Sequence, residues 1–371
     1  MVPEVRVGLL LHFFQPWWQF PDVLAKINEE CYRPVFELVE KCAGNFTFTA
    51  NVQATLLDYW ATHDRETLGR LRSAVASGKI ELMGGAGEHP ILPLIPRREA
   101  IRQIARDAGA KLVHDVQVNS RGFFFPEMAH SPDVLTLARE LGYGWTVLQD
   151  NSLPFSPPFN YITETRGMNV FLRSAHWSRY IWDEHMDFYR VREKMRYELP
   201  NWVGREKAYI VMAMDAETFG HHATDDLLNR FFSPALTVWG SDGTLTPFGT
   251  LLKLFPSRPV SDLRSGSWST TEEDFVAGNP YPLWRSPGNA LHALYAELLE
   301  VAFGCPENQV FTTERLQMAN SCHTWWVSKS RYRPDFFMFG VERAMRVIRG
   351  SGNAEAKSKG ENILVKITRQ L

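Results

Sequence analysis

Short apolar strands that alternate with helical patterns dominate the first two thirds of the chain. Runs typical of strands lie at 5–13, 46–52, 79–85, 122–127, 144–149, 168–174, 208–215 and 258–263. Because these runs are apolar at consecutive positions, both faces of the strands are expected to be buried, as in parallel sheets covered by helices. About seven strands over this length fit a closed or nearly closed (β/α) barrel, and a doubly wound sheet stays open as an alternative.

The strand pattern ends near Ser269, and helical periodicity continues to the end of the 371-residue chain. The apolar spacing in NALHALYAELLEVAF and PDFFMFGVERAMRVIRGSG is that of amphipathic helices. We therefore predict a barrel over residues 1–268 and a helical domain over residues 269–371.

Charge and cysteine usage exclude several classes of protein. The formal net charge is −2, and no long run of one sign occurs, so neither nucleic acid nor a membrane surface is an expected partner. The four cysteines form no CxxC pair, which argues against a zinc ribbon and favours reduced thiols. The early apolar run VGLLLHFF lacks the features of a signal peptide, so we predict a cytoplasmic protein that binds a neutral ligand.

Polar side chains recur at the carboxyl ends of the predicted strands, where the loops of a parallel barrel meet. In chain order they are His12 with Gln15, Asn51 with Gln53, Glu81 with His89, Glu127, Gln149 with Asp150, Asp215 with Glu217, His221 and His222, and Asp262 with Trp268. Each has a purely structural alternative when taken singly, such as a buried core histidine at position 12 or a helix cap at Asp215. Their repetition favours a shared site.

Glu127 and Asp215 stand out within this group, because each follows a strongly apolar strand. Two carboxylates in one region of low dielectric repel each other, so their pKa values move apart and one of them keeps a proton. One carboxylate and one carboxylic acid are what cleavage of a glycosidic bond with retention requires, at a separation of about 5 to 5.5 Å. Twelve tryptophans supply candidate faces for stacking on sugar rings.

Five stretches of the chain carry a family resemblance. They are HFFQP (12–16), IELMGGAGEHPILPLIP (80–96), GFFFPEMAH (122–130), MDAETFGHH (214–222) and ANSCHTWW (319–326). In this order they resemble the five sequence regions of glycoside hydrolase family 57, which contains retaining amylases, 4-α-glucanotransferases, branching enzymes and some α-galactosidases. The resemblance covers nearly the whole chain, and the second and fourth stretches are the most specific.

The resemblance implies an incomplete (β/α)7 barrel followed by a C-terminal helical bundle that contributes to the active-site cleft. It also implies Glu127 as the nucleophile, Asp215 as the general acid and base, no catalytic metal and no organic cofactor. The expected substrate is an α-linked glucan or oligosaccharide. We expect the remaining site residues to bind sugar hydroxyls, to stack on sugar rings or to hold the carboxylates, and they are His12, Gln15, Glu81, His89, Glu217, His222, Trp268 and Trp325.

Two departures and four alternatives accompany this interpretation. Phe14 stands where the family usually has a second histidine, and Arg179 stands where an acid is common. Short length favours an amylase-like hydrolase, with a transglycosylase or an α-galactosidase on the same scaffold as alternatives. A zinc enzyme is a further alternative, although no HxD, HxxxH or HExxH pattern with suitable geometry is present. A non-catalytic sugar-binding barrel is the alternative from another class.

Overall fold

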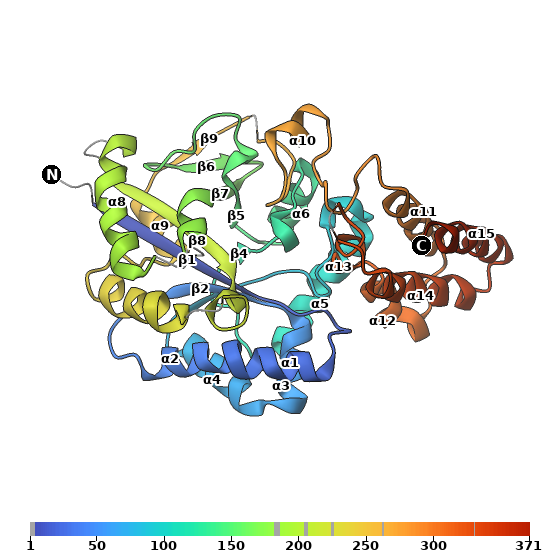
Figure 1. Cartoon of the computed structure of the whole chain (residues 1–371), viewed down its shortest axis with the longest axis horizontal. Helices are drawn as coiled ribbons and strands as arrows, with labels where there is room; N and C mark the ends of the chain where they lie inside the picture. The colour runs from blue at the N-terminus through green and yellow to red at the C-terminus, as the bar shows by residue number, and fades with distance from the viewer. Residues whose placement is uncertain (1–3, 182–185, 204–206, 224–225, 262, 330) are drawn as a thin grey trace.

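Seven parallel strands form a nearly closed barrel in the computed structural model, which describes residues 4–181, 186–203, 207–223, 226–261, 263–329 and 331–371 (Figure 1). The barrel strands are β1 (Val5–Phe13), β2 (Phe48–Val52), β3 (Ile80–Met83), β4 (Gly122–Phe123), β5 (Trp145–Gln149), β7 (Met168–Arg173) and β8 (Ala208–Asp215). Helices follow the barrel in sequence and in space. The predicted fold, an incomplete (β/α)7 barrel followed by a helical segment, is confirmed.

The strand order is β3-β2-β1-β8-β7-β5-β4, with β8 in the middle. The end strands β3 and β4 meet through Gly84, whose N–H donates to the carbonyl of Gly122 at 2.9 Å and whose carbonyl accepts from Phe124 N–H at 2.9 Å. A weak seam lies between β7 and β8, which pair only at Arg173 and Val211. All seven strands run parallel, so their carboxyl ends share one rim.

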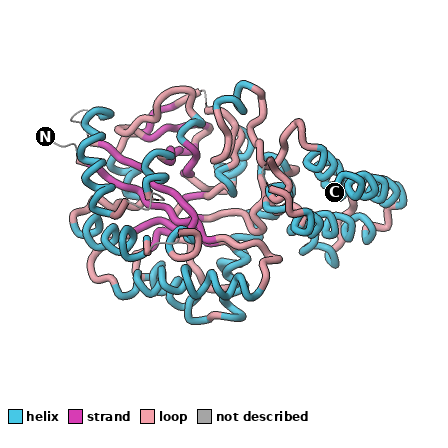
Figure 2. The backbone as a smooth tube through the Cα atoms, viewed as in Figure 1, coloured by secondary structure: helices cyan, strands magenta, loops and turns pink. Residues whose placement is uncertain are grey.

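Helices surround the strands and continue into a separate group beyond the barrel (Figure 2). Those before Ser269 are α1 (Pro21–Ile27), α2 (Arg33–Lys41), α3 (Ala54–His63), α4 (Arg65–Ala76), α5 (Arg97–Val113), α6 (Pro132–Glu140), α7 (Ala175–Tyr180), α8 (Phe188–Val203) and α9 (Phe248–Leu254). The later ones are α10 (Glu272–Val276), α11 (Ala290–Gly304), α12 (Thr312–Gln317), α13 (Cys322–Trp325), α14 (Pro334–Gly350) and α15 (Ala354–Gln370). Among the described residues, no helix is both long and apolar enough to span a membrane.

The inside of the barrel is filled by apolar side chains together with α9. Phe248 and Leu251 of α9 pack among inward-facing residues such as Leu10, Phe171 and Val211. Gly8 of β1 permits this approach, because a Cβ atom there would lie only 3.1 Å from the ring of Phe248. The barrel is thus a packed core whose free face is the rim at the carboxyl ends of the strands.

Three predicted elements differ from the structure. The run at 258–263 is not a barrel strand: β9 (Ser257–Pro259) is short, exposed and paired with β6 (Ile162–Thr165) outside the barrel. Asp262, predicted at its end, lies outside the described residues. The run at 122–127 forms a strand only at its first two residues, because the chain turns at Pro126. Residues 21–42, whose apolar spacing in the sequence predicts one continuous helix, contain a π-helical turn, η1 (Asn28–Tyr32), between α1 and α2.

A buried ion pair joins the helical segment to the barrel. Nη2 of Arg315 in α12 lies 2.8 Å from Oε1 of Glu99 in α5, and both side chains are buried. Arg315 also donates to three carbonyls at the end of α11. Burial alone raises the pKa of Glu99, but the hydrogen bonds and charges of Arg315 and Arg102 outweigh it, so the pKa is lowered. Nearby, Asn320 pairs with Pro90 of the barrel.

Arg315→Met is expected to lower the free energy of unfolding by about 3 kcal/mol, because it leaves Glu99 buried with fewer partners and three carbonyls without a donor. Urea unfolding followed by circular dichroism measures the change. The matched control is Arg349→Met, which removes the exposed pair with Glu361 and should cost less than about 1 kcal/mol.

The lowered pKa of Glu99 means that its ionised form stabilises the fold at neutral pH, and this contribution is lost as the pH falls through the folded pKa. The difference in free energy of unfolding between wild type and Arg315→Met should therefore become smaller as the pH falls. Equal losses of stability in Arg315→Met and Arg349→Met would contradict the role of the pair.

Candidate active site

A chain of hydrogen bonds at the barrel rim leads to the predicted carboxylates. His12 of β1 pairs in register with Asp215 at the end of β8 and with Asn51 of β2. Nδ1 of His12 lies 2.9 Å from Oδ1 of Asn51, and its Nε2 lies 3.0 Å from Nε2 of His89. Burial lowers the pKa of both imidazoles, so both rings are neutral at physiological pH.

Glu127 lies at the other end of this chain, in the turn η3 (Pro126–Met128) that follows β4. Its Oε1 is 3.6 Å from Nδ1 of His89 and 3.2 Å from the hydroxyl of Ser321, which donates to it. Its Oε2 accepts a hydrogen bond of 2.6 Å from the indole N–H of Trp268. The side chain is 17% exposed. Three distant parts of the chain therefore fix a carboxylate that still reaches solvent.

The backbone is strained at the same place. Glu127, Met128 and His89 have φ values of 59°, 50° and 57°, in the left-handed region that side chains other than glycine rarely adopt. Each such residue costs about 1 to 2 kcal/mol, and the strain persists only where the surrounding structure holds it. Three of the six described non-glycine residues with positive φ thus lie at Glu127 and His89, which makes this part of the rim a candidate site.

The two carboxyl groups differ in their hydrogen bonds. Burial raises the pKa of Glu127 to about 7, and the charge of Asp215 raises it as well, whereas the bonds from Trp268 and Ser321 lower it. Asp215 is exposed at the end of β8, yet the surrounding protein removes part of its hydration and raises its pKa, whereas the positive charge of Arg173 acts in the opposite direction. Within the described part of the chain, no hydrogen-bond donor contacts the Asp215 carboxyl. Donors favour an ionised Glu127, and their lack favours a protonated Asp215.

Glu217 is the third acid of the region and is not placed to reach a ligand. It is only 3% exposed, and its Oε1 accepts hydrogen bonds from the hydroxyl of Tyr32 and from Nε2 of Gln15, the latter at 2.9 Å. Burial, followed by the charge of Asp215, raises its pKa to about 8. Glu217 and Gln15 therefore form a buried hydrogen-bonded pair that lies within reach of the charge of Asp215.

Glu81 lies apart from this cluster. Its carboxylate accepts hydrogen bonds of 2.8 Å from the hydroxyl of Thr49 and from the backbone N–H groups of Phe248 and Gly249 at the start of α9. These partners make Glu81 the cap of the helix inside the barrel. We leave it out of the proposed sugar-binding set.

The other predicted ligands differ in their exposure and contacts. Trp268 is 43% exposed while it contacts Glu127, so part of its ring is available to a sugar. Trp325 is partly buried, and the guanidinium of Arg331 lies 4.0 Å from the centre of its ring. His222 is exposed, and its backbone N–H donates to the carbonyl of Glu217 at 2.8 Å.

Two contacts of the site were missing from the predicted set of site residues. Ser321 touches both His89 and Glu127, and it lies within the quoted stretch ANSCHTWW, so the family resemblance offered a signal. Tyr32 contacts Glu217 from η1, and nothing in the helical pattern of residues 21–42 distinguished it from a core aromatic.

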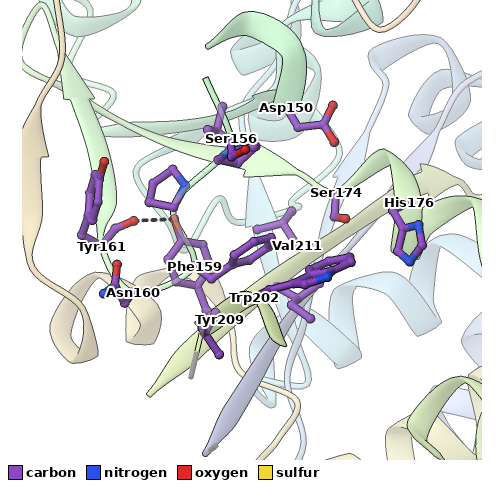
Figure 3. Close-up of a pocket in the computed structure, with 15 residues that line it drawn as sticks. Asp150, Ser156, Phe159, Asn160, Tyr161, Ser174, His176, Trp202, Tyr209 and Val211 are labelled. Atoms are coloured by element: carbon purple, nitrogen blue, oxygen red, sulfur yellow. Dashed lines mark hydrogen bonds between the residues drawn. The ribbon is translucent and has the colours of Figure 1, made fainter. Parts of the chain in front are cut away.

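A cavity of about 730 Å³ opens at the weak seam between β7 and β8, and neither Glu127 nor Asp215 lines it. Figure 3 shows Phe159, Trp202 and His176 around it, with Asp150 at one side. The carboxylate of Asp150 accepts from the backbone N–H groups of Asn151 and Ala175, both at 2.9 Å. The Asp150 carboxylate, which is the polar group best suited to bind a ligand, is thus already hydrogen-bonded to the backbone. We therefore assign no ligand to this cavity.

The described residues contain no group of three or more histidine, cysteine, aspartate or glutamate side chains arranged to hold a metal ion. The ring nitrogens of His12 are both occupied, by Asn51 and by His89.

Comparison with known proteins gives consistent relatives. The model for "Glycosyl hydrolase family 57" matches residues 10–237. An alpha-amylase of Pyrococcus abyssi is 23% identical over 203 residues, which is 54% of this chain and 28% of that protein. A 4-alpha-glucanotransferase of Thermococcus litoralis is 24% identical over 194 residues, 51% of this chain and 27% of that protein. Each match thus spans little more than a quarter of the curated relative.

Solved structures agree on the fold. The crystal structure of the 4-alpha-glucanotransferase from Thermococcus litoralis superposes with a TM-score of 0.75 at 18% identity and covers 94% of this chain and 60% of that one. A GH57-type branching enzyme from Pyrococcus horikoshii gives 0.70 at 16% identity, with 96% and 94% covered. At these identities the likeness concerns the fold alone.

Proposed function

Because the chain belongs to glycosyl hydrolase family 57, we propose that it is a retaining glycoside hydrolase that acts on α-linked glucan or oligosaccharide. The observation that carries this proposal is the pair of carboxyl groups at the barrel rim. They come from different strands, the charge of Asp215 raises the pKa of Glu127, and only Glu127 has hydrogen-bond donors that favour its ionised form.

In the proposed first step, Glu127 attacks the anomeric carbon while the bond from that carbon to the leaving oxygen breaks. Asp215 gives its proton to the leaving oxygen, and a covalent glycosyl ester on Glu127 remains. In the second step Asp215 takes a proton from water, the water oxygen attacks the anomeric carbon, and the ester bond breaks. Glu127 returns as a carboxylate and Asp215 as an acid, so atoms and protons balance over the cycle.

The electrostatics suit both halves of this cycle. Repulsion between two carboxylates is reciprocal, so an ionised Glu127 helps Asp215 to keep its proton before the first step. Once Glu127 is esterified its charge is gone, the pKa of Asp215 falls, and Asp215 becomes the base that the second step needs. Glu217 is a poor rival for the role of the acid, because its buried carboxyl lies under Tyr32 and Gln15.

The remaining residues receive supporting roles. His12 and His89 hold the carboxylates, since their ring nitrogens are engaged within the protein. We assign Trp268, Trp325 and His222 to sugar contacts, and Gln15 and Glu217 to the support of Asp215. The substrate is the expected partner, and a cytoplasmic location stays our prediction.

The test is a substrate panel of p-nitrophenyl α-glucoside and α-galactoside, maltooligosaccharides and soluble glucan, with products resolved by chromatography. Proton NMR of the first product should show the α anomer before mutarotation. Longer oligosaccharides or branched products would assign the chain to transglycosylation instead of hydrolysis. A first product of β configuration, or binding of glucan with no turnover on any member of the panel, would refute the proposal.

A further inference from the structure

The segment that carries Ser321 is fixed against the barrel by its backbone. The N–H of Ser321 donates to the carbonyl of His89 at 3.0 Å, and the neighbouring residue Asn320 pairs with Pro90. The side chain is buried, with 2% exposed. Its hydroxyl lies 2.9 Å from Nδ1 of His89 and 3.2 Å from Oε1 of Glu127. Ser321 therefore bridges the histidine pair and the proposed nucleophile.

The orientation of Asn51 determines where the protons of this network lie. Its Nδ2 donates to the carbonyl of Gly84 at 3.1 Å, and a carbonyl only accepts, so Oδ1 is the atom that faces His12. Nδ1 of His12 must then carry the hydrogen. Because the ring is neutral, Nε2 of His12 is bare and accepts from Nε2–H of His89 at 3.0 Å.

The same logic continues to the nucleophile. With its proton on Nε2, a neutral His89 presents a lone pair at Nδ1, toward Ser321 and toward Oε1 of Glu127 at 3.6 Å. A lone pair and a carboxylate oxygen repel each other, and a proton between them removes the repulsion. The Ser321 hydroxyl has one hydrogen, which it can donate in a hydrogen bond either to Nδ1 of His89 or to Oε1 of Glu127.

We propose that Ser321 is a positioning residue for Glu127. The hydroxyl proton of Ser321 turns toward Oε1 of Glu127 when that carboxylate is ionised, and toward Nδ1 of His89 when Glu127 carries its own proton. This inference rests on the proposed function and assigns to the helical segment a part in setting the ionisation of the nucleophile. Trp268 holds the other oxygen. Glu127 is thereby held at both oxygens by residues that lie beyond the last barrel strand.

Other titratable groups also face Glu127 and are unchanged by a substitution of Ser321. They are His89 at 3.6 Å, the charge of Asp215, and the thiol of Cys322, whose pKa is raised by burial and then by the charge of Glu127. The pKa of about 7 for Glu127 places its titration within the range of an ordinary assay.

The experiment compares Ser321→Ala with Ser321→Thr, which keeps a hydroxyl, and with Ser328→Ala. Ser328 is a buried serine of the same segment whose hydroxyl donates to the carbonyl of Trp325 at 2.8 Å. The quantity measured is kcat/KM against pH on the best aryl α-glycoside, and the carboxyl of Glu127 is titrated by ¹³C NMR. Glu127→Gln identifies its signal by difference.

In Ser321→Ala, loss of a donor to the ionised form should move the acid limb of kcat/KM to higher pH by about one unit. The rate should fall about five- to tenfold at pH 6, with less loss at higher pH and little change in KM. Ser321→Thr should restore the profile, and Ser328→Ala should match wild type.

An unshifted acid limb, or an equal loss at every pH, would overturn the proposal, as would an unchanged NMR titration of Glu127. If wild type and Ser328→Ala cleave no glycoside at all, the proposed function fails. The NMR titration then still decides whether Ser321 acts on Glu127.

Discussion

Glu127→Gln is expected to lower glycoside cleavage about 10⁴-fold or more while the protein stays folded. The substitution keeps the size of the side chain and its contacts with Trp268 and Ser321, but an amide does not attack the anomeric carbon. The first step then loses its nucleophile, so the covalent intermediate does not form. Steady-state rates on the best substrate, together with thermal unfolding, measure the effect.

Glu88→Gln is the matched control for Glu127→Gln. Glu88 is also a buried glutamate, and burial raises its pKa to about 7, but its partner is Arg106 rather than a group of the rim. We expect a rate within a few-fold of wild type. Comparable losses in the two variants would mean that Glu127 matters only as a buried acid.

Azide tests the geometry of the nucleophile as well as its identity. In Glu127→Gly, an azide ion fits the space left by the side chain and attacks the anomeric carbon from the same face. An activated α-glycoside should therefore give a β-glycosyl azide. An α-glycosyl azide from this variant would show that the covalent step occurs elsewhere.

Continuous apolar runs made the barrel predictable from the sequence. A strand buried on both faces must be apolar at consecutive positions, as in AYIVMAMD of β8, and no surface element shares this requirement. The prediction of a barrel strand at 258–263 was wrong, because β9 lies at an exposed edge, where packing does not require a pattern of apolar residues. The π-helical turn η1 was not foreseen, because residues 28–32 keep an apolar spacing compatible with an ordinary helix.

The sequence predicted the site residues whose positions follow from the ends of the strands. It missed those whose positions depend on how helices and side chains pack. His12 and Asp215 follow from parallel strands that end at one rim, and their pairing in register bears out that they lie together. Glu81 shows the limit of this inference, because position near a strand end does not reveal that its carboxylate serves α9. Ser321 approaches Glu127 from 194 residues away, through helix packing that periodicity does not specify.

Asp215→Asn is expected to separate the two steps of the reaction, because the asparagine neither donates nor accepts the catalytic proton. With a glucan, whose leaving oxygen needs that proton, the rate should fall on the order of 10³-fold or more. With a 2,4-dinitrophenyl α-glycoside, whose leaving group departs unprotonated, the first step should stay fast. A burst of dinitrophenol followed by slow turnover is then the expected time course.

The pH dependence and the product with azide complete the test of Asp215. The basic limb of kcat/KM should vanish in Asp215→Asn, since that limb reports loss of the proton from the acid. Azide should accelerate release of the intermediate and yield an α-glycosyl azide, opposite to the product of Glu127→Gly. Glu217→Gln serves as the comparison, because Glu217 also keeps a proton near neutral pH, with a pKa of about 8. If Glu217→Gln gives the burst and the α-azide while Asp215→Asn does not, the proton donor is the buried carboxyl of Glu217 and not the exposed carboxyl of Asp215.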